Sequence, residues 1–319
     1  MHPLQPIFVG GTGRSGSTVT GYLLGAHADI WNTKPREIRF LTDTGGLLDL
    51  VQGYGGRVHP SIDPTARGAS LAKSWLVQTR RISRKQVPVS PRTFMRGMYG
   101  PWWERTSPDG EPRGMHRGIE IEPYRAALER FDAALRHDRH AAAFGLIHEL
   151  LDPLAIKNGA VAWADTTPQN AENAHRIVEL LPDAKIIFMI RDGRDTCASV
   201  LQKQWGPADP FAALEWWRRG ALRATKSMAE LGPDQGITIR LSRLIDTDRE
   251  DALRRLFEFV GHPITPEVRA FFDRRMPSHK GHVTRWRRDI PQDDLPRFSK
   301  RYGEIHEELT SLGLDLPAL

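Results

Sequence analysis

The chain has 319 residues, of which 39% are hydrophobic, so it can bury a substantial core in one large domain or two. Its formal net charge of +6 suits an anionic ligand, but the basic residues are dispersed and form no recognised nucleic-acid-binding motif, which argues against a nucleic-acid partner. No apolar run approaches the ~18 residues that a membrane span needs, and the single cysteine, Cys197, excludes an intrachain disulfide.

The stretch from Phe8 to Leu24 predicts a buried strand, a tight turn and the start of a helix. An apolar run at residues 7–9 stops at paired glycines, and a loop of Gly, Ser, Thr and one Arg leads to a helix beginning near Ser17. The glycines let the main chain approach a ligand closely, and N–H groups of the loop and helix start then converge on it. We expect this loop to bind phosphate or a phosphate analogue.

The loop has the spacing of a Walker A motif but lacks its lysine. Gly11 and Gly16 are separated as in G-x-x-x-x-G-K-[ST], yet Ser17 and Thr18 follow the second glycine directly. The cation lies inside the loop instead, at Arg14. This arrangement suits a 5′-phosphate and its attached group better than a triphosphate–metal complex. A glycine-rich turn without a ligand is the alternative.

A second strand end is predicted within Lys185–Leu201. Residues 186–190 form a continuous apolar run, typical of a parallel strand covered on both faces, and a helix follows the break. Arg191 would then project from the carboxyl end of the strand, where open α/β sheets bind ligands. Ser199 lies eight residues further, about two helical turns, so its hydroxyl is expected near the same anion.

Together these stretches resemble the PAPS-dependent sulfotransferase superfamily, in a bacterial-type branch similar to the tyrosylprotein and carbohydrate sulfotransferases. In that family a strand–loop–helix holds the 5′-phosphosulfate of 3′-phosphoadenosine 5′-phosphosulfate (PAPS). A later R-[DN]-x-R-[DE] strand end, with a serine eight residues after its first arginine, holds the 3′-phosphate. The donor-binding residues that the resemblance implies are Gly11, Thr12, Gly13, Arg14, Ser15, Gly16, Ser17, Thr18, Arg191 and Ser199. Arg14 stands where the cytosolic branch has lysine.

Glu37 is the expected general base. It follows a short predicted strand at Ile30 and Trp31, placed beside the first strand, and the resemblance implies a glutamate at this position facing the acceptor hydroxyl. Sulfuryl transfer requires removal of the hydroxyl proton, and a positioned carboxylate contributes about 10²–10⁴-fold to such a step. The alternative is a surface glutamate paired with Arg36 or Arg39. His27, the rival by residue type, is interpreted as a structural residue in the turn after the first helix.

The region from about 54 to 150 is interpreted as an acceptor-binding insertion. Residues 88–117 mix Pro, Gly, Arg and aromatic side chains, which suits either a lid or a cover for a satellite core. Amphipathic helices are predicted at Glu122–Arg136 and Ala141–Leu151.

The second half supplies a third strand near Ala160–Ala164 and a last one at 237–239. Thr166 occupies the position of a family lysine, so either Arg14 carries more of the leaving-group charge or Lys34 or Lys280 assists; the sequence leaves these alternatives open. Asp165 is interpreted as a helix cap rather than a second acid. A basic loop resembles the family's K-G-x-x-G-x-W segment, which implies that Lys280 and Gly281 contact the donor.

The expected fold is one α/β domain over residues 1–319, P-loop-like, with a mainly parallel sheet of four or five strands between helices. The expected function is metal-free, in-line sulfuryl transfer from PAPS to a hydroxyl on a carbohydrate, glycolipid or small metabolite, leaving adenosine 3′,5′-bisphosphate. Arg14 and Glu37 are the catalytic residues. A P-loop kinase and a catalytically silent nucleotide-binding protein are the alternatives. A cytoplasmic location without a signal peptide is expected, and a homodimer is compatible with the sequence.

Overall fold

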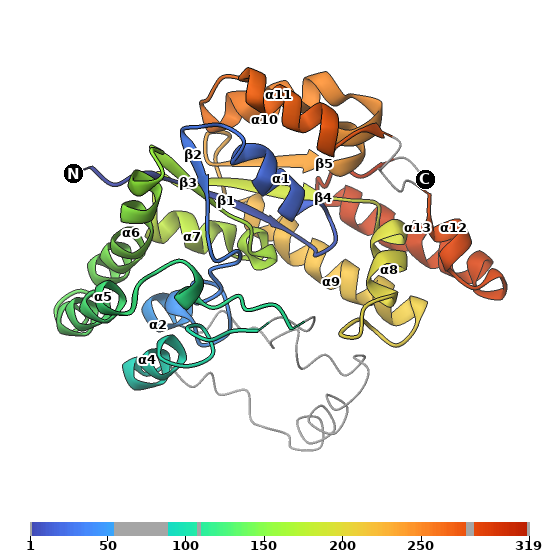
Figure 1. Ribbon diagram of the computed structural model, residues 1–319. Helices are drawn as coiled ribbons and strands as arrows, with labels where there is room; N and C mark the ends of the chain where they lie inside the picture. The colour runs from blue at the N-terminus through green and yellow to red at the C-terminus, as the bar shows by residue number, and fades with distance from the viewer. Residues whose placement is uncertain (1, 54–88, 107–109, 279–283, 318–319) are drawn as a thin grey trace, which may run out of the picture.

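The computed structural model describes residues 2–53, 89–106, 110–278 and 284–317 (Figure 1). A central sheet contains the five strands β1 (Gln5–Gly11), β2 (Ile30–Asn32), β3 (Ala162–Asp165), β4 (Lys185–Ile190) and β5 (Gly236–Arg240). Their order across the sheet is β2-β3-β1-β4-β5, and every pairing is parallel. The predicted fold class is therefore confirmed.

One prediction about the sheet is wrong. The short strand at Ile30 and Trp31 does not lie beside the first strand, because β3 separates the two. Trp31 is level with Trp163 of β3, and Pro6 of β1 pairs with the other side of Trp163. β2 is consequently an edge strand.

Helices cover both faces of the sheet (Figure 1). The α-helices are α1 (Ser17–Leu24), α2 (Leu47–Gln52), α4 (Pro91–Met98), α5 (Ile121–Ala134), α6 (Arg139–Lys157), α7 (Ala174–Leu180), α8 (Gly193–Leu201), α9 (Pro210–Met228), α10 (Arg249–Val260), α11 (Pro266–Arg275), α12 (Trp286–Asp289) and α13 (Leu295–Ser311). The 3₁₀ segments are η2 (Met115–Arg117), η3 (Pro168–Asn173) and η6 (Gln292–Asp294), and η4 (Arg243–Thr247) is a π-helix. No helix of the described residues combines the length and hydropathy of a membrane span.

The alternation of side chains along β1 explains the layers. Ile7 and Val9 point into a core shared with α1, α10 and α11, whereas Phe8 points to the opposite face. There Phe8 meets Trp163 edge-on, with ring centroids 5.4 Å apart, in a cluster that includes α5 and α6. These two helices fall within or next to the expected insertion and pack into the main core. The insertion's role toward an acceptor stays a prediction.

A third core lies under the other half of that face, between β4, α8, α9 and α13. Trp217 and Tyr302 are fully buried there, and so is the free thiol of Cys197. Burial raises the pKa of the Cys197 thiol well above its ordinary value, which makes it a packing residue rather than a nucleophile. The cores fix β1 and β4 at the centre of the sheet, so their carboxyl ends are rigid neighbours.

Candidate functional site

The loop after β1 is held in conformations that expose main-chain N–H groups. Gly13 and Gly16 have φ values of 78° and 96°, and Arg14 between them has a φ of 55°, the left-handed region that favours glycine. At Gly11 a side chain would be impossible, because a Cβ atom would lie 2.1 Å from the hydroxyl of Ser15 and 2.7 Å from a main-chain oxygen of β4. The glycine pattern therefore serves close approach of the loop to β4.

Polar groups of this loop lack partners in the described part of the chain. The hydroxyl oxygens of Thr12 and Ser15 are buried without a hydrogen bond. Helix α1 begins at Ser17, and the N-cap residue before it, Gly16, has no side chain, so the first-turn N–H groups have no side-chain acceptor there. Buried donors of this kind are costly unless a ligand satisfies them. A phosphate or sulfate group would do so, and the positive end of the helix dipole would favour its charge.

The end of β4 meets the same loop. The Nε atom of Arg14 donates a hydrogen bond of 3.1 Å to the hydroxyl of Ser199 on α8, and Arg191 donates one of 3.4 Å to the carbonyl of Arg14. Burial lowers the pKa of the Arg191 guanidinium. The positive charges of Arg285 and Arg14 lower this pKa further, whereas the negative charge of Asp195 raises it. The site thus concentrates positive charge, as a doubly anionic ligand requires. The two predicted motifs lie together, although their contacts with a donor stay predictions.

Asp195 connects this strand end to the C-terminal loop. Its carboxylate accepts hydrogen bonds from the main-chain nitrogens of Thr284 (3.0 Å) and Trp286 (3.2 Å), and burial raises its pKa against the effect of these bonds. The residues that follow positions 279–283 are therefore fixed near the end of β4. Lys280 and Gly281, the residues predicted to contact the donor, lie outside the described residues. Asp195 is a site residue that motif reasoning missed, although it occupies the acidic fifth position of the R-[DN]-x-R-[DE] pattern.

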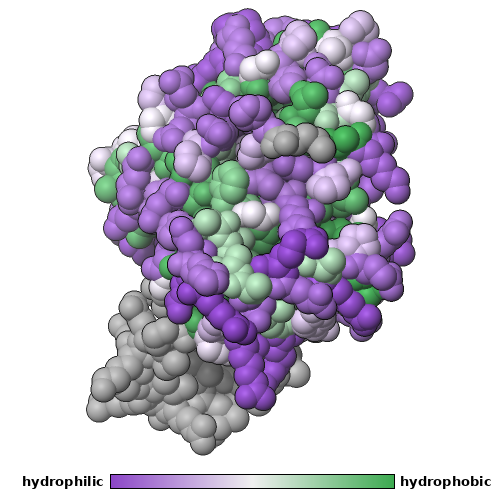
Figure 2. Space-filling view, turned by 90° about the vertical axis from the view of Figure 1, so that its left-hand side faces the viewer, coloured by the Kyte–Doolittle hydropathy of each residue, from purple (hydrophilic) through white to green (hydrophobic). Residues whose placement is uncertain are grey.

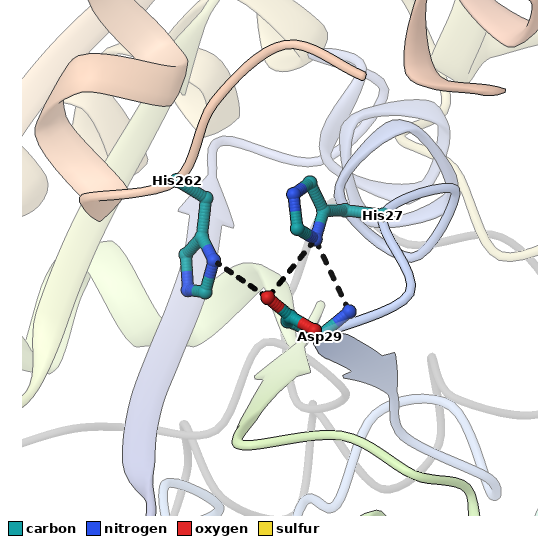
Figure 3. Close-up of side chains that lie close together, drawn as sticks. All are labelled: His27, Asp29 and His262. Atoms are coloured by element: carbon teal, nitrogen blue, oxygen red, sulfur yellow. Dashed lines mark hydrogen bonds and ion pairs between the residues drawn. The ribbon is translucent and has the colours of Figure 1, made fainter. Parts of the chain in front are cut away.

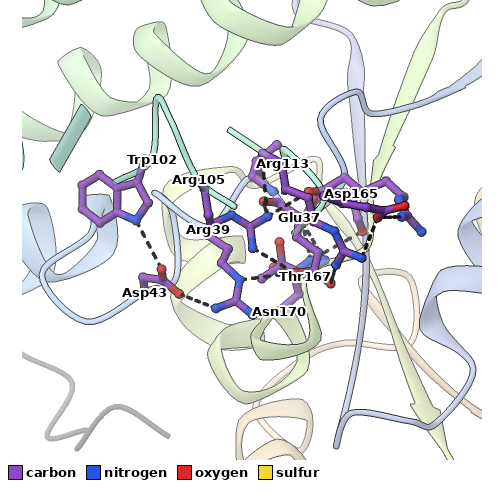
Figure 4. A network of polar contacts seen from close by, with 12 residues as sticks. Glu37, Arg39, Asp43, Trp102, Arg105, Arg113, Asp165, Thr167 and Asn170 are labelled. Carbon is purple, nitrogen blue, oxygen red and sulfur yellow. Dashed lines mark hydrogen bonds and ion pairs between the residues drawn. The ribbon is translucent and has the colours of Figure 1, made fainter. Parts of the chain in front are cut away.

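Glu37 lies in a cluster of arginines (Figure 4). Its carboxylate is 3.3 Å from Nε of Arg39, 3.4 Å from Nη1 of Arg105 and 3.9 Å from Nη1 of Arg113. The pairing with Arg39 that was weighed as an alternative is present, whereas Arg36 contacts Glu111 at 3.5 Å. Its role as a base stays a prediction.

The expected insertion supplies two of these arginines. Arg105 donates to the main-chain oxygens of residues 36 and 37 at 3.2 and 3.1 Å, and burial together with Arg39 lowers the pKa of its guanidinium. Trp102 nearby packs against Phe94 and donates from Nε1 to Asp43 at 3.2 Å. The described part of segment 88–117 therefore contributes both core aromatics and charged neighbours of Glu37. Nothing in local spacing indicated Arg105 or Arg113, because they are distant from Glu37 in sequence.

Asp165 joins the Glu37 segment to the sheet. Its buried carboxylate accepts from the main-chain nitrogens of Ile38 and Thr167, both at 3.0 Å, and from the side chain of Asn170 at 2.8 Å (Figure 4). These bonds give the Asp165 carboxylate a structural role at the carboxyl end of β3, the strand next to β1. Thr166 is turned toward α1, where its methyl group would lie 2.2 Å from a Cβ at Gly21. It offers no cation in place of the family lysine.

Comparisons with known proteins identify the family of this chain and solved structures of similar fold. Residues 6–266 match the model of a sulfotransferase family. The sulfotransferase domain of the curacin biosynthetic pathway is similar in structure, with 14% identity, a TM-score of 0.50 and 99% coverage of both chains. The sulfotransferase domain of the Synechococcus PCC 7002 olefin synthase has 14% identity and a TM-score of 0.46, with 99% of this chain and 96% of that domain covered. The sulfotransferase STF9 of Mycobacterium avium has 16% identity and a TM-score of 0.41, with 85% of this chain and 68% of that chain covered. No curated protein matches the sequence significantly. Because the family model spans most of its length, this chain belongs to the sulfotransferase family.

Proposed function

We propose that the protein transfers the sulfuryl group of PAPS to a hydroxyl acceptor. The observation that carries the proposal is the hydrogen bond from Arg14 to Ser199, because it joins the loop after β1 to the helix after β4. A ligand with two phosphate-type groups would find a donor set at each strand end. The loop with Arg14 would hold the 5′-phosphosulfate, while Arg191 and Ser199 would hold the 3′-phosphate.

The unpartnered hydroxyls support the 5′-end of this assignment. Thr12 and Ser15 are buried where a bound phosphosulfate would accept their protons in hydrogen bonds. Neutral donors and one guanidinium suit a group whose charge grows during the reaction. They would act as preorganised electrostatic stabilisation of the leaving phosphate, without a metal ion.

The transfer itself is an in-line displacement at sulfur. The acceptor oxygen forms a bond to sulfur as the bond from sulfur to the bridging phosphate oxygen breaks. The hydroxyl proton passes to Glu37, and the negative charge remains on the 5′-phosphate of adenosine 3′,5′-bisphosphate. The arginine contacts of Glu37 measure 3.3–3.9 Å, longer than the ~2.7–2.9 Å of a strong charge-assisted bond, which supports a carboxylate that can still accept a proton.

The acceptor remains a hydroxyl on a carbohydrate, a glycolipid or a small metabolite. We place the reaction in the cytoplasm, which suits the buried, free thiol of Cys197.

Two measurements test the proposal. Adenosine 3′,5′-bisphosphate should bind with 1:1 stoichiometry in a calorimetric titration, and incubation of a cell extract with ³⁵S-labelled PAPS and the enzyme should label an acceptor for identification by mass. Transfer should persist in EDTA, unlike kinase activity. Binding without any labelled acceptor would favour a silent nucleotide-binding protein, and failure to bind would reject the donor assignment.

A further inference from the structure

A cluster of two histidines and an aspartate lies at the C-terminal end of α1, away from the loop that joins β1 to α1 (Figure 3). His27 belongs to the turn after α1, Asp29 precedes β2, and His262 follows the end of α10. One carboxylate oxygen of Asp29 is 4.0 Å from Nδ1 of His27 and 3.9 Å from Nδ1 of His262. The three candidate ligand atoms lie within 4.8 Å of one another.

The backbone of all three residues is fixed by hydrogen bonds. The carbonyl of Asp29 accepts from the main-chain nitrogens of Val161 and Ala162 at 2.9 and 3.0 Å, which ties it to the start of β3. Gly261 ends α10 with a φ of 76°, and the next residue, His262, donates its main-chain N–H to Phe257 at 3.1 Å. His27 donates its own N–H to the carbonyl of Leu24 at 3.0 Å. The side chains therefore converge from preformed positions.

The contacts of the His27 ring indicate which of its nitrogens could bind a metal. The main-chain N–H of Asp29 donates to Nδ1 of His27 at 3.1 Å, so the proton of a neutral His27 is on Nε2 and a metal at Nδ1 would replace this hydrogen bond. That Nε2 atom is buried and has no hydrogen-bond partner in the described part of the chain.

We propose that His27, Asp29 and His262 form a binding site for one zinc ion. Two imidazole nitrogens and a carboxylate oxygen are ligands that this ion prefers, at bond lengths of ~2.0–2.2 Å. The Nδ1 lone pair of His27 would turn from the neighbouring N–H to the metal. Water would complete the coordination, or Glu267, which lines the same cavity as His27. The side chain of Asp29 is 52% exposed, so the ion has a path from solvent.

The proposed site has a structural consequence. Its ligands come from the turn between α1 and β2 and from the end of α10, elements that are far apart in sequence. A bound ion would connect the edge of the sheet to the helices above it. Binding should therefore raise the thermal stability of the folded chain, independently of sulfuryl transfer.

The test is a calorimetric titration of the untagged, full-length, EDTA-treated protein with ZnCl₂. We expect one ion per chain, with a dissociation constant of about 10 µM or tighter, weaker than complete four-ligand sites. His262→Gln and Asp29→Asn should each weaken binding at least about tenfold. His148→Gln is the matched control, because His148 and Asp152 form another histidine–aspartate pair with a separation of 3.0 Å.

Two further readouts separate ligation from folding. Co²⁺ should give the visible absorption of a tetrahedral complex in the wild type but not in the Asp29→Asn variant, whose circular dichroism should be unchanged. Adenosine 3′,5′-bisphosphate affinity should be equal in both proteins, because the sites are separate. No saturable Zn²⁺ binding, or equal binding by His262→Gln and the wild type, would overturn the proposal.

Discussion

Replacement of Arg14 should weaken the binding of adenosine 3′,5′-bisphosphate. The guanidinium of Arg14 donates to Ser199, so under the proposed donor assignment its loss would remove one charge-assisted contact to the ligand and leave the serine hydroxyl without this donor. A hydrogen bond to a charged group contributes ~1.5–3 kcal/mol, which corresponds to a dissociation constant about 10- to 150-fold higher. Isothermal titration calorimetry of Arg14→Ala measures this change directly.

The left-handed backbone at Arg14 allows an effect on ligand affinity to be distinguished from an effect on folding stability. Arg14 has a φ of 55°, which costs a residue with a Cβ about 1–2 kcal/mol relative to glycine. Arg14→Gly and Arg14→Ala should therefore lose equal affinity, while the glycine variant unfolds at a higher urea concentration. Arg254→Ala on α10 removes one exposed arginine elsewhere and should leave affinity unchanged.

Ser199→Ala provides the second arm of a double-mutant cycle. Alone it should raise the dissociation constant by about 2- to 12-fold, and the double variant should lose less than the product of the single losses, because the residues share a contact. A dissociation constant of Arg14→Ala within twofold of the wild type would refute the reasoning that places an anion at this loop.

Three further predictions concern the base and the scaffold. Glu37→Gln should lower kcat by about 10²–10⁴-fold in the labelled-donor assay while bisphosphate binding is retained, and wild-type turnover would remove Glu37 from the role. Gly10→Ala should destabilise the fold by ~1–3 kcal/mol in urea, since its Cβ would lie 2.1 Å from a main-chain nitrogen of η3. Gly145→Ala, in an open position of α6, should instead stabilise by ~0.5–1 kcal/mol, and the opposite order would contradict the packing. Arg176→Ala should cost ~3–5 kcal/mol, because the guanidinium pairs at 3.0 Å with buried Asp49; a cost below ~1 kcal/mol would show that the pair is dispensable.

The local signals in the sequence predicted the central elements well. Apolar runs ending in glycine-rich or charged breaks located β1 and β4, and the helices after them begin within a few residues of the predicted positions. The adjacency of the two strand ends followed from the family resemblance, and the structure places Arg14 and Ser199 in contact. The family itself is confirmed.

What escaped prediction depends on contacts between distant segments. The order of strands placed β3 between β1 and β2, which no periodicity within Ile30–Asn32 could reveal. Arg105 and Arg113 contact Glu37 from the segment 88–117, where the sequence pattern indicates a lid or a satellite core and no contact with Glu37. His262 lies far along the chain from His27, so neither had the spacing of a metal motif.

The central position of β1 also has a consequence for biosynthesis. Phe8 pairs with Asp165 on one side and with Ile186 on the other, so β1 is synthesised well before either of its partner strands. Such non-local pairing is slow, and an apolar strand exposed in the meantime is prone to aggregate. Nascent chains truncated before β3 should therefore require a chaperone, and donor recognition should first appear in fragments that extend beyond α8.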